Sequence, residues 1–133
     1  MFSTKGRYAL RIMIDLAQQQ SEELVPLKDT AERIGVSKKY LEIIAKDLVK
    51  AKLISATSGK HGGYALTRSP ENYTVGEIIE IMEGPIVPIA CLLPDAEECP
   101  RVESCPTLPM WKEFAQIEHD FFFGKKLSDL VHS

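Results

Sequence analysis

The chain of 133 residues has only three cysteines and no apolar run of the roughly 18 residues that a membrane span requires. Its N-terminus does not combine a charged region with a long apolar stretch, so we expect neither a membrane span nor a signal peptide, and we expect a cytoplasmic protein. An odd number of cysteines in a reducing compartment disfavours a disulfide framework and favours metal binding or thiol chemistry. Hydrophobic residues make up 44% of the chain and charged residues 26%, which is typical of one folded domain, or of one domain with an appended arm.

The charge of the chain is unevenly distributed between its halves. The net charge is -3, yet residues 1–68 carry 12 lysines and arginines against 7 aspartates and glutamates, whereas residues 69–133 carry 4 against 12. A basic N-terminal half suits a phosphate-bearing partner, and such asymmetry is a known indication of nucleic-acid binding. A solvated basic face without a partner is the alternative that charge alone leaves open.

The first fifty residues predict a helix-turn-helix. Apolar residues recur at helical spacing over residues 9–17, 27–34 and 41–49. Pro26 precedes the second of these segments, Gly35 ends it, and Ser37 can cap the third. The small Ala31 permits close approach of the helices, and Leu41, six residues after the turn at Gly35, faces inward, as is typical of a helix-turn-helix.

The outer face of the third predicted helix carries cations and groups that can contact base edges. These residues are Lys38, Lys39, Tyr40, Glu42, Lys46 and Lys50. Lysines bind phosphates and a carboxylate can read a base edge, so this helix suits the major groove of DNA. An ordinary helical hairpin with a lysine-rich solvated surface is the alternative.

A β-hairpin is predicted directly after the third helix. Residues 53–57 and 64–67 are β-prone, and the flexible loop between them reads Ser58-Gly59-Lys60-His61-Gly62-Gly63. The loop lacks the spacing of a nucleotide-binding Walker motif and no helix follows it, so we interpret it as a basic wing, with His61 as a polar wing residue. In a winged helix-turn-helix, the helix enters the major groove while the wing reaches the flanking backbone or minor groove.

The second half of the chain predicts two more helices, separated by a proline-rich segment that carries the cysteines. Thr74 and Glu77 form a capping box for a helix that Gly84-Pro85 ends. Six prolines and all three cysteines lie within residues 85–109, and a long amphipathic helix is expected over residues 111–121. A loop of this length inside a small domain usually carries function, and its cysteines indicate the same.

Five sequence motifs are spread over nearly the whole chain. They are Ser3-Thr4-Lys5-Gly6-Arg7-Tyr8-Ala9, Tyr40-Leu41-Glu42, Gly62-Gly63-Tyr64, Val75-Gly76-Glu77-Ile78-Ile79 and Leu127-Ser128-Asp129-Leu130-Val131. By these motifs the chain resembles the bacterial winged-helix regulators that include the iron-sulfur regulator IscR, the nitric-oxide sensor NsrR and the cysteine-metabolism repressor CymR. The resemblance implies a homodimer, joined through its long C-terminal helix, that binds a near-palindromic double-stranded DNA operator and controls transcription. The apolar face over residues 111–121 independently favours a dimer, because so small a chain cannot easily bury it alone.

The predicted fold is mainly α with a small β-hairpin wing. Residues 1–84 would form the winged helix-turn-helix DNA-binding domain, residues 85–109 a cysteine-bearing sensor loop, and residues 110–133 the dimerisation helix and C-terminal segment. An enzyme is not expected, because the cysteine loop has no histidine near it in sequence that could activate a thiol.

The resemblance assigns DNA contacts to Ser37, Tyr40 and Glu42 on the recognition helix and to Ser58, Gly59 and Lys60 on the wing. Glu42 can accept a hydrogen bond from a cytosine amino group, whereas Lys38 and Lys39 are expected to bind phosphates. The iron-sulfur regulator has an arginine at the wing's entrance, where this chain has Ser58, and the cation is displaced to Lys60.

The same resemblance implies that Cys91, Cys99 and Cys105 bind an iron-sulfur cluster, either 2Fe-2S or 4Fe-4S. Thiolates are the preferred ligands of such clusters. Zinc on these thiolates is a less favoured alternative, and metal-free thiols are another. No inherited fourth ligand is present, because the family's histidine position is Leu108 and its acidic position is Arg7. Other candidates for this ligand are Asp95, Glu97, Glu98, Glu103, His119 and His132.

Residues 81–86, Ile-Met-Glu-Gly-Pro-Ile, resemble instead the cysteine-metabolism branch, which lacks the cluster and is controlled by a partner enzyme of cysteine synthesis. Two hypotheses therefore stay open: a regulator modulated by a cluster, and a cluster-free repressor of cysteine and sulfur metabolism genes controlled by a partner protein or by thiol redox state. For the first, we hypothesise that an occupied cysteine loop shifts the dimer helix and so sets the separation of the recognition helices, which must be about 34 Å.

Overall fold

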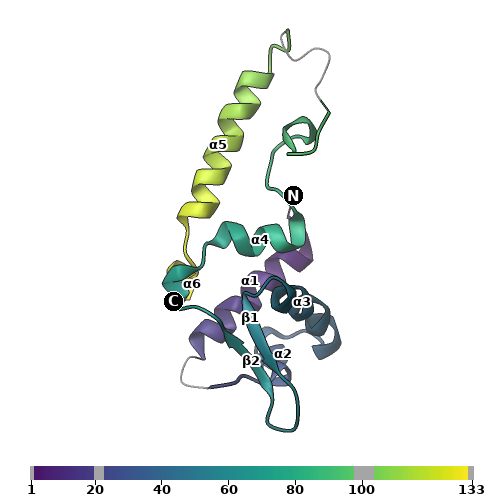
Figure 1. Cartoon of the computed structure of the whole chain (residues 1–133), viewed down its shortest axis with the longest axis vertical. Helices are drawn as coiled ribbons and strands as arrows, with labels where there is room; N and C mark the ends of the chain where they lie inside the picture. Colours follow the sequence, from purple (N-terminus) through teal and green to yellow (C-terminus); the bar gives the residue numbers. More distant parts are fainter. Residues whose placement is uncertain (1, 20–22, 98–103, 132–133) are drawn as a thin grey trace.

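The computed structural model describes residues 2–19, 23–97 and 104–131. Its helices are α1 (Thr4–Gln18), α2 (Leu27–Ile34), α3 (Lys38–Lys50), α4 (Val75–Glu83), α5 (Leu108–Gly124) and α6 (Leu127–Val131), with 3-10 turns η1 (Pro70–Asn72) and η2 (Ala90–Leu92). Strands β1 (Ile54–Thr57) and β2 (Gly63–Leu66) form an antiparallel hairpin. The predicted mainly α fold with a hairpin wing is confirmed, and Figure 1 shows α5 as an arm extending away from the winged domain.

Helices α1 to α3 share one core, and local sequence explains where α2 ends and α3 begins. Their inward faces bury Ile12, Met13, Leu41, Ile44 and Leu48 almost completely. Gly35 ends α2 with a φ of 84°, a left-handed conformation that side chains disfavour, and its N–H donates to the Ala31 carbonyl at 2.8 Å. The Ser37 hydroxyl accepts the Tyr40 N–H at 3.1 Å and caps α3. The predicted glycine turn and capped helix are therefore confirmed.

A buried acid connects α1 to α2. Asp15 is buried, and its carboxylate accepts a hydrogen bond from the Thr30 hydroxyl at 2.8 Å. The Arg33 guanidinium completes the network, with Nε and Nη2 at 2.7 and 2.9 Å from the two carboxylate oxygens. A buried carboxylate is costly unless hydrogen bonds and an opposite charge satisfy it, so this network fixes α2 against α1.

A single residue outside the hairpin pairs with the wing close to its loop. In the hairpin, Ile54 lies opposite Leu66 and Thr57 lies opposite Gly63. Val25, just before α2, pairs with Tyr64 through two backbone hydrogen bonds of 2.9 Å each. Gly63 permits this approach, because a Cβ there would lie 2.7 Å from the Val25 carbonyl group. The hairpin is thereby attached to the segment that leads into the helix-turn-helix.

Tyr73 is fully buried where the wing meets the remaining helices. Its hydroxyl donates to the Leu53 carbonyl at 2.7 Å and accepts the N–H groups of Thr67 and Arg68 at 2.8 and 3.0 Å. These groups flank β1 and β2, so one side chain closes the open end of the hairpin. The Tyr73 carbonyl also accepts the Leu127 N–H at 3.1 Å, which places the start of α6 against the same core.

Helix α4 connects the winged domain to α5. The predicted capping box is confirmed: the Thr74 hydroxyl accepts the Glu77 N–H at 3.2 Å, and the Glu77 carboxylate accepts the Thr74 N–H at 2.9 Å. A Cβ on Gly76 would lie 2.5 Å from the Phe123 ring, so α4 packs closely on the end of α5. Within the described residues, no helix is long and apolar enough to span a membrane.

The Tyr73 hydroxyl can be tested by removing it alone. We expect Tyr73→Phe to lower the free energy of unfolding by about 1–3 kcal/mol, because the Thr67 and Arg68 N–H groups lose this acceptor and the Leu53 carbonyl keeps only the longer bond from the Thr67 hydroxyl. Urea unfolding at fixed protein concentration measures this difference. Tyr8→Phe is the matched control and should change stability by less than about 0.5 kcal/mol. Equal effects of the two substitutions would show that the Tyr73 hydrogen bonds do not stabilise the wing.

Candidate nucleic-acid interface

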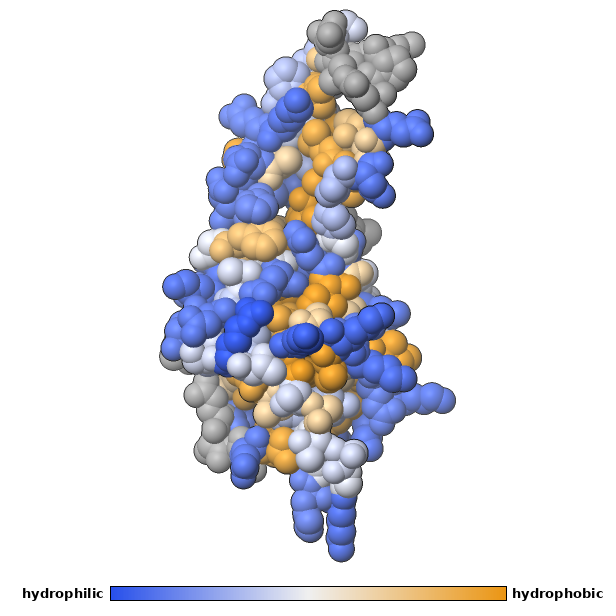
Figure 2. Space-filling view, viewed as in Figure 1, coloured by the Kyte–Doolittle hydropathy of each residue, from blue (hydrophilic) through white to orange (hydrophobic). Residues whose placement is uncertain are grey.

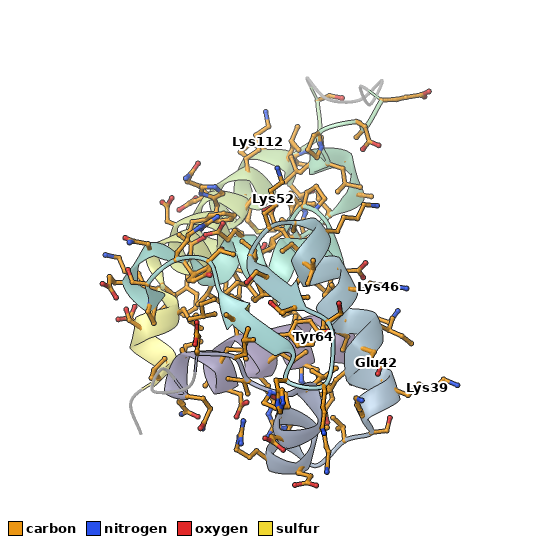
Figure 3. The ribbon with its side chains drawn as sticks, turned by 60° about the horizontal axis from the view of Figure 1, so that its bottom comes forward. Lys39, Glu42, Lys46, Lys52, Tyr64 and Lys112 are labelled. Atoms are coloured by element: carbon orange, nitrogen blue, oxygen red, sulfur yellow. The ribbon has the colours of Figure 1, made fainter. Side chains whose placement is uncertain are left out.

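The outward face of α3 is basic and exposed. Lys39, Lys46 and Lys50 are exposed and fall on the side opposite to the buried Leu41 and Leu48. Figure 3 shows Lys39, Glu42 and Lys46 along α3, with the two lysines projecting away from the molecule. Long cationic side chains on one helix face can bind phosphates on both sides of a DNA groove. The lysines expected from the sequence therefore share one accessible surface.

At the start of α3, the predicted contact residues differ in how free their side chains are. The Ser37 hydroxyl is engaged as the helix cap, whereas Lys38 and Glu42 are exposed and lie 3.8 Å apart as an i,i+4 ion pair. Such an exposed pair contributes little to stability, so both groups are available to a ligand. Partial burial and then the Glu42 carboxylate raise the pKa of Tyr64 above its ordinary value. Glu42 is thus electrostatically coupled to β2, close to the wing loop.

Tyr40 is half-buried and holds α3 against α1. Its ring meets the Tyr8 ring edge-on, with centroids 5.8 Å apart. The Arg11 guanidinium lies over the same Tyr8 ring, 5.6 Å from its centroid. Tyr8 therefore contacts both the exposed guanidinium of Arg11 and the ring of Tyr40. Arg11 is an exposed cation of α1 that was not predicted as a site residue, because its contact with Tyr8 depends on packing.

A groove of about 600 Å³ runs between the wing and the beginnings of α2 and α3. Lys28, Lys38 and Lys60 line it, one each from α2, α3 and the wing loop, together with Glu42. Three cations against one carboxylate make the groove positive, which suits a DNA backbone. Lys28 was not predicted, because α2 carries no pattern of its own that indicates DNA binding.

The wing loop carries the predicted residues at its tip. Ser58, Gly59, Lys60 and His61 are all exposed. Gly59 has a φ of 108°, and its carbonyl accepts the Gly62 N–H at 3.1 Å, so a tight turn presents Lys60 and His61 to solvent. Figure 1 shows the hairpin extending beyond the helices at the end of the molecule opposite to α5. The loop is placed to contact a ligand that lies across α3.

Two of the three cysteines lie within the described residues. Cys91 is exposed on η2, and Cys105 is half-buried before α5, with its sulfur 3.6 Å from the Thr107 hydroxyl. Hydrogen bonds from the Thr107 hydroxyl, and then from the Thr107 and Leu108 backbone, lower the pKa of Cys105 below its ordinary value. Cys99 lies outside the described residues. Within residues 2–19, 23–97 and 104–131, no three His, Cys, Asp or Glu side chains gather into a group that could hold a metal ion.

The donor chemistry of this segment suits an iron-sulfur cluster, because thiolates bind such clusters and the lowered pKa of Cys105 makes its thiolate easier to form. Of the other candidate ligands, Asp95, Glu97 and His119 are exposed. Glu98, Glu103 and His132 lie outside the described residues.

One face of α5 is apolar and uncovered. Met110, Phe114, Ile117 and Phe121 are 53%, 44%, 57% and 56% exposed, and they follow one another at intervals of four, three and four residues. This spacing places them in a single stripe, as in the seam between two packed helices. Figure 2 shows apolar surface along the arm that contains α5.

A capped helix with a basic outer face, beside a basic groove and an exposed hairpin tip, defines a winged helix-turn-helix DNA-binding regulator. The chain belongs to the Rrf2 family, described as an iron-dependent transcriptional regulator, and matches it over residues 2–133. The family expected from the sequence motifs is thereby confirmed, and regulators of this family bind DNA and are generally dimeric.

Several known proteins are similar to this chain over most of their length. Protein rrf2 of Nitratidesulfovibrio vulgaris is 37% identical over 131 residues, which cover 97% of this chain and 85% of that protein. The structure of CymR (YrzC), the global cysteine regulator of B. subtilis, has a TM-score of 0.79 at 35% identity and covers 98% of this chain and 95% of its own. The structure of T. potens IscR has a TM-score of 0.76 at 33% identity, and the match covers 98% of this chain and 85% of that one. These relatives are transcriptional regulators, which agrees with the prediction that the protein is not an enzyme.

Proposed function

We propose that the protein is a homodimeric transcriptional regulator that reads an operator through the outward face of α3 and grips the flanking backbone through its wing. The observation that carries this proposal is the line of exposed lysines, Lys39, Lys46 and Lys50, on a capped helix beside the basic groove. Lys38 and Lys60, which line the groove, would bind phosphates, and Glu42 would accept a hydrogen bond from a cytosine amino group. Ser37 would act by capping α3, so that the free N–H groups of the helix end suit a phosphate.

The homodimer would form through the apolar stripe of α5, namely Met110, Phe114, Ile117 and Phe121. Four large side chains exposed in one line cost free energy in water, and a second copy of the same stripe can cover them. Two-fold symmetry then provides two recognition helices, which suit a near-palindromic operator.

The DNA proposal separates phosphate contacts from base contacts. Replacing Lys38 and Lys39 by alanine should weaken binding to all sequences and lower the slope of log affinity against log salt by about 0.9 for each lost phosphate contact. Glu42→Ala should instead relax preference at one base pair by about fivefold or more. Fluorescence anisotropy at several salt concentrations, on selected and scrambled duplexes, measures both. Lys112→Ala, which removes one positive charge from α5, is the control and should keep the salt slope of the wild type. An unchanged slope in the double variant, or equal loss on every sequence from Glu42→Ala, would contradict these roles.

The dimer proposal is tested at the centre of the stripe. Ile117→Asp should raise the dimer dissociation constant at least a hundredfold, because the interface would have to bury an unpaired carboxylate. Sedimentation equilibrium measures the constant, and Glu113→Gln, at an exposed polar position of α5, should leave it unchanged. A dimer of wild-type strength in Ile117→Asp would place the interface elsewhere.

We further propose that Cys91, Cys99 and Cys105 hold an iron-sulfur cluster, with zinc as the less favoured occupant. The lowered pKa of Cys105 and the exposure of Cys91 support this, since a ligand must be an accessible thiolate. A bound cluster would make this segment responsive to iron supply or oxidation. An effect of this segment on α5 is supported by a shared groove of about 390 Å³, which Ile86 and Leu92 line with Lys112 and His119 of α5.

A second candidate is a cluster-free regulator of cysteine and sulfur metabolism, controlled by a partner enzyme of cysteine synthesis or by thiol redox state. The similarity to CymR of B. subtilis, 42% identity over 99 residues, favours it. In that case the cysteines are structural or redox-active thiols rather than metal ligands.

Anaerobic purification separates the two candidates. A cluster predicts visible absorbance with iron and acid-labile sulfide, all lost when Cys91, Cys99 and Cys105 are replaced by alanine while the protein stays folded. Zinc without iron would support the less favoured metal. A colourless, metal-free protein that binds operator tightly and responds to a cysteine-synthesis enzyme or to thiol oxidation would exclude the cluster and support the second candidate.

A further inference from the structure

Ile43 is the only large hydrophobic side chain of α3 that remains exposed, and half of it is accessible to solvent. It follows Lys39 by four residues and precedes Lys46 by three, so helical geometry places it between them on the outward face. The two residues adjacent to Ile43 in sequence differ in their exposure to solvent, since Glu42 is exposed and Ile44 is fully buried. Ile43 therefore lies at the centre of the surface that carries the lysines.

A single exposed isoleucine on an ordinary surface needs no explanation. This one has Lys39, Lys46 and the exposed Asp47 as its neighbours on the helix surface. The two lysines suit an anionic partner, and a partner that covers Ile43 must also offer an apolar group. The major groove of DNA offers one such group on its base edges, the C5-methyl of thymine, inside a frame of phosphates. A β-branched side chain on a helix has essentially one rotamer, so Ile43 is already ordered for such a contact.

We propose that Ile43 contacts the methyl group of one thymine in each half-site, within one or two base pairs of the base that Glu42 contacts. Specificity would then have two parts, a polar contact from Glu42 and an apolar one from Ile43. The inference rests on the proposed operator binding and adds a specificity-determining residue and the base that it reads.

Replacement of thymine by deoxyuridine tests the contact, because it removes the methyl group and leaves base pairing intact. An operator is first obtained by selection from random duplexes with the wild-type protein, and each thymine of the half-site is then replaced, one position at a time, in both half-sites. Burial of one methyl group predicts an affinity loss of about threefold to fourfold per half-site at one position. Fluorescence anisotropy at constant salt measures the ratio of the two affinities.

The variants assign the methyl effect to Ile43. Ile43→Ala should bind the thymine and deoxyuridine operators equally, and Ile43→Val should keep part of the difference. Lys46→Ala, on the same face, should weaken binding to both operators and preserve their ratio, because it removes a phosphate contact.

Two outcomes overturn the inference: a wild-type protein for which no thymine of the half-site responds to the loss of its methyl group, or an Ile43→Ala variant that keeps the wild-type ratio. Either can occur while sequence-specific binding persists, in which case the operator-binding proposal stands and the inference alone fails. A wild-type protein that selects no sequence at all overturns both.

Discussion

The buried hydroxyl of Tyr73 is the point where the wing, α4 and the C-terminal helices meet. It satisfies one carbonyl and two N–H groups at the open end of the hairpin, while the Tyr73 carbonyl accepts the N–H of Leu127. Beside it, the Lys125 carbonyl accepts the Val75 N–H at 2.8 Å, so the chain leaving α5 pairs with the residues that begin α4. The position of the wing and the direction of the α5 arm thus depend on one buried polar network, whose disruption leaves buried groups without partners.

The two ends of the molecule differ in the chemistry of their surfaces. The winged end presents exposed lysines and a basic groove, whereas α5 presents an uncovered apolar stripe. The close packing of Phe123 on Gly76 connects them through α4. Helix α5 also contacts the segment that precedes α1, because the ring centroids of Phe122 and Phe2 lie 5.3 Å apart. Under the proposed sensing role, a rearrangement of the cysteine segment against α5 would reach the winged domain through these contacts and through the C-terminal return of the chain.

For the candidate site, the sequence placed the residues of α3 correctly on its exposed face, because helical spacing alone separates the lysines from the buried leucines. It gave the Ser37 hydroxyl two roles, helix cap and ligand contact, and the structure shows this hydroxyl engaged as the cap. It also missed Arg11 and Lys28, since their distance from α3 and the wing depends on how other side chains pack. The turn that follows α3 could not be predicted either, because Lys52, a residue with no strong turn preference, adopts a φ of 65° there.

The short-range features follow from the sequence alone: the glycine turn at Gly35, the caps at Ser37 and Thr74, the β-prone segments of the wing and the apolar spacing of α5. Each depends on residues within a few positions of one another, where local hydrogen bonds and side-chain period decide the structure. Three features depend on the packed core: Val25 pairs with Tyr64 of the wing, Tyr73 closes the hairpin, and residues 127–131 return to the winged domain. Those pairings join residues far apart in the chain, and they form only where the complete core brings buried donors and acceptors together.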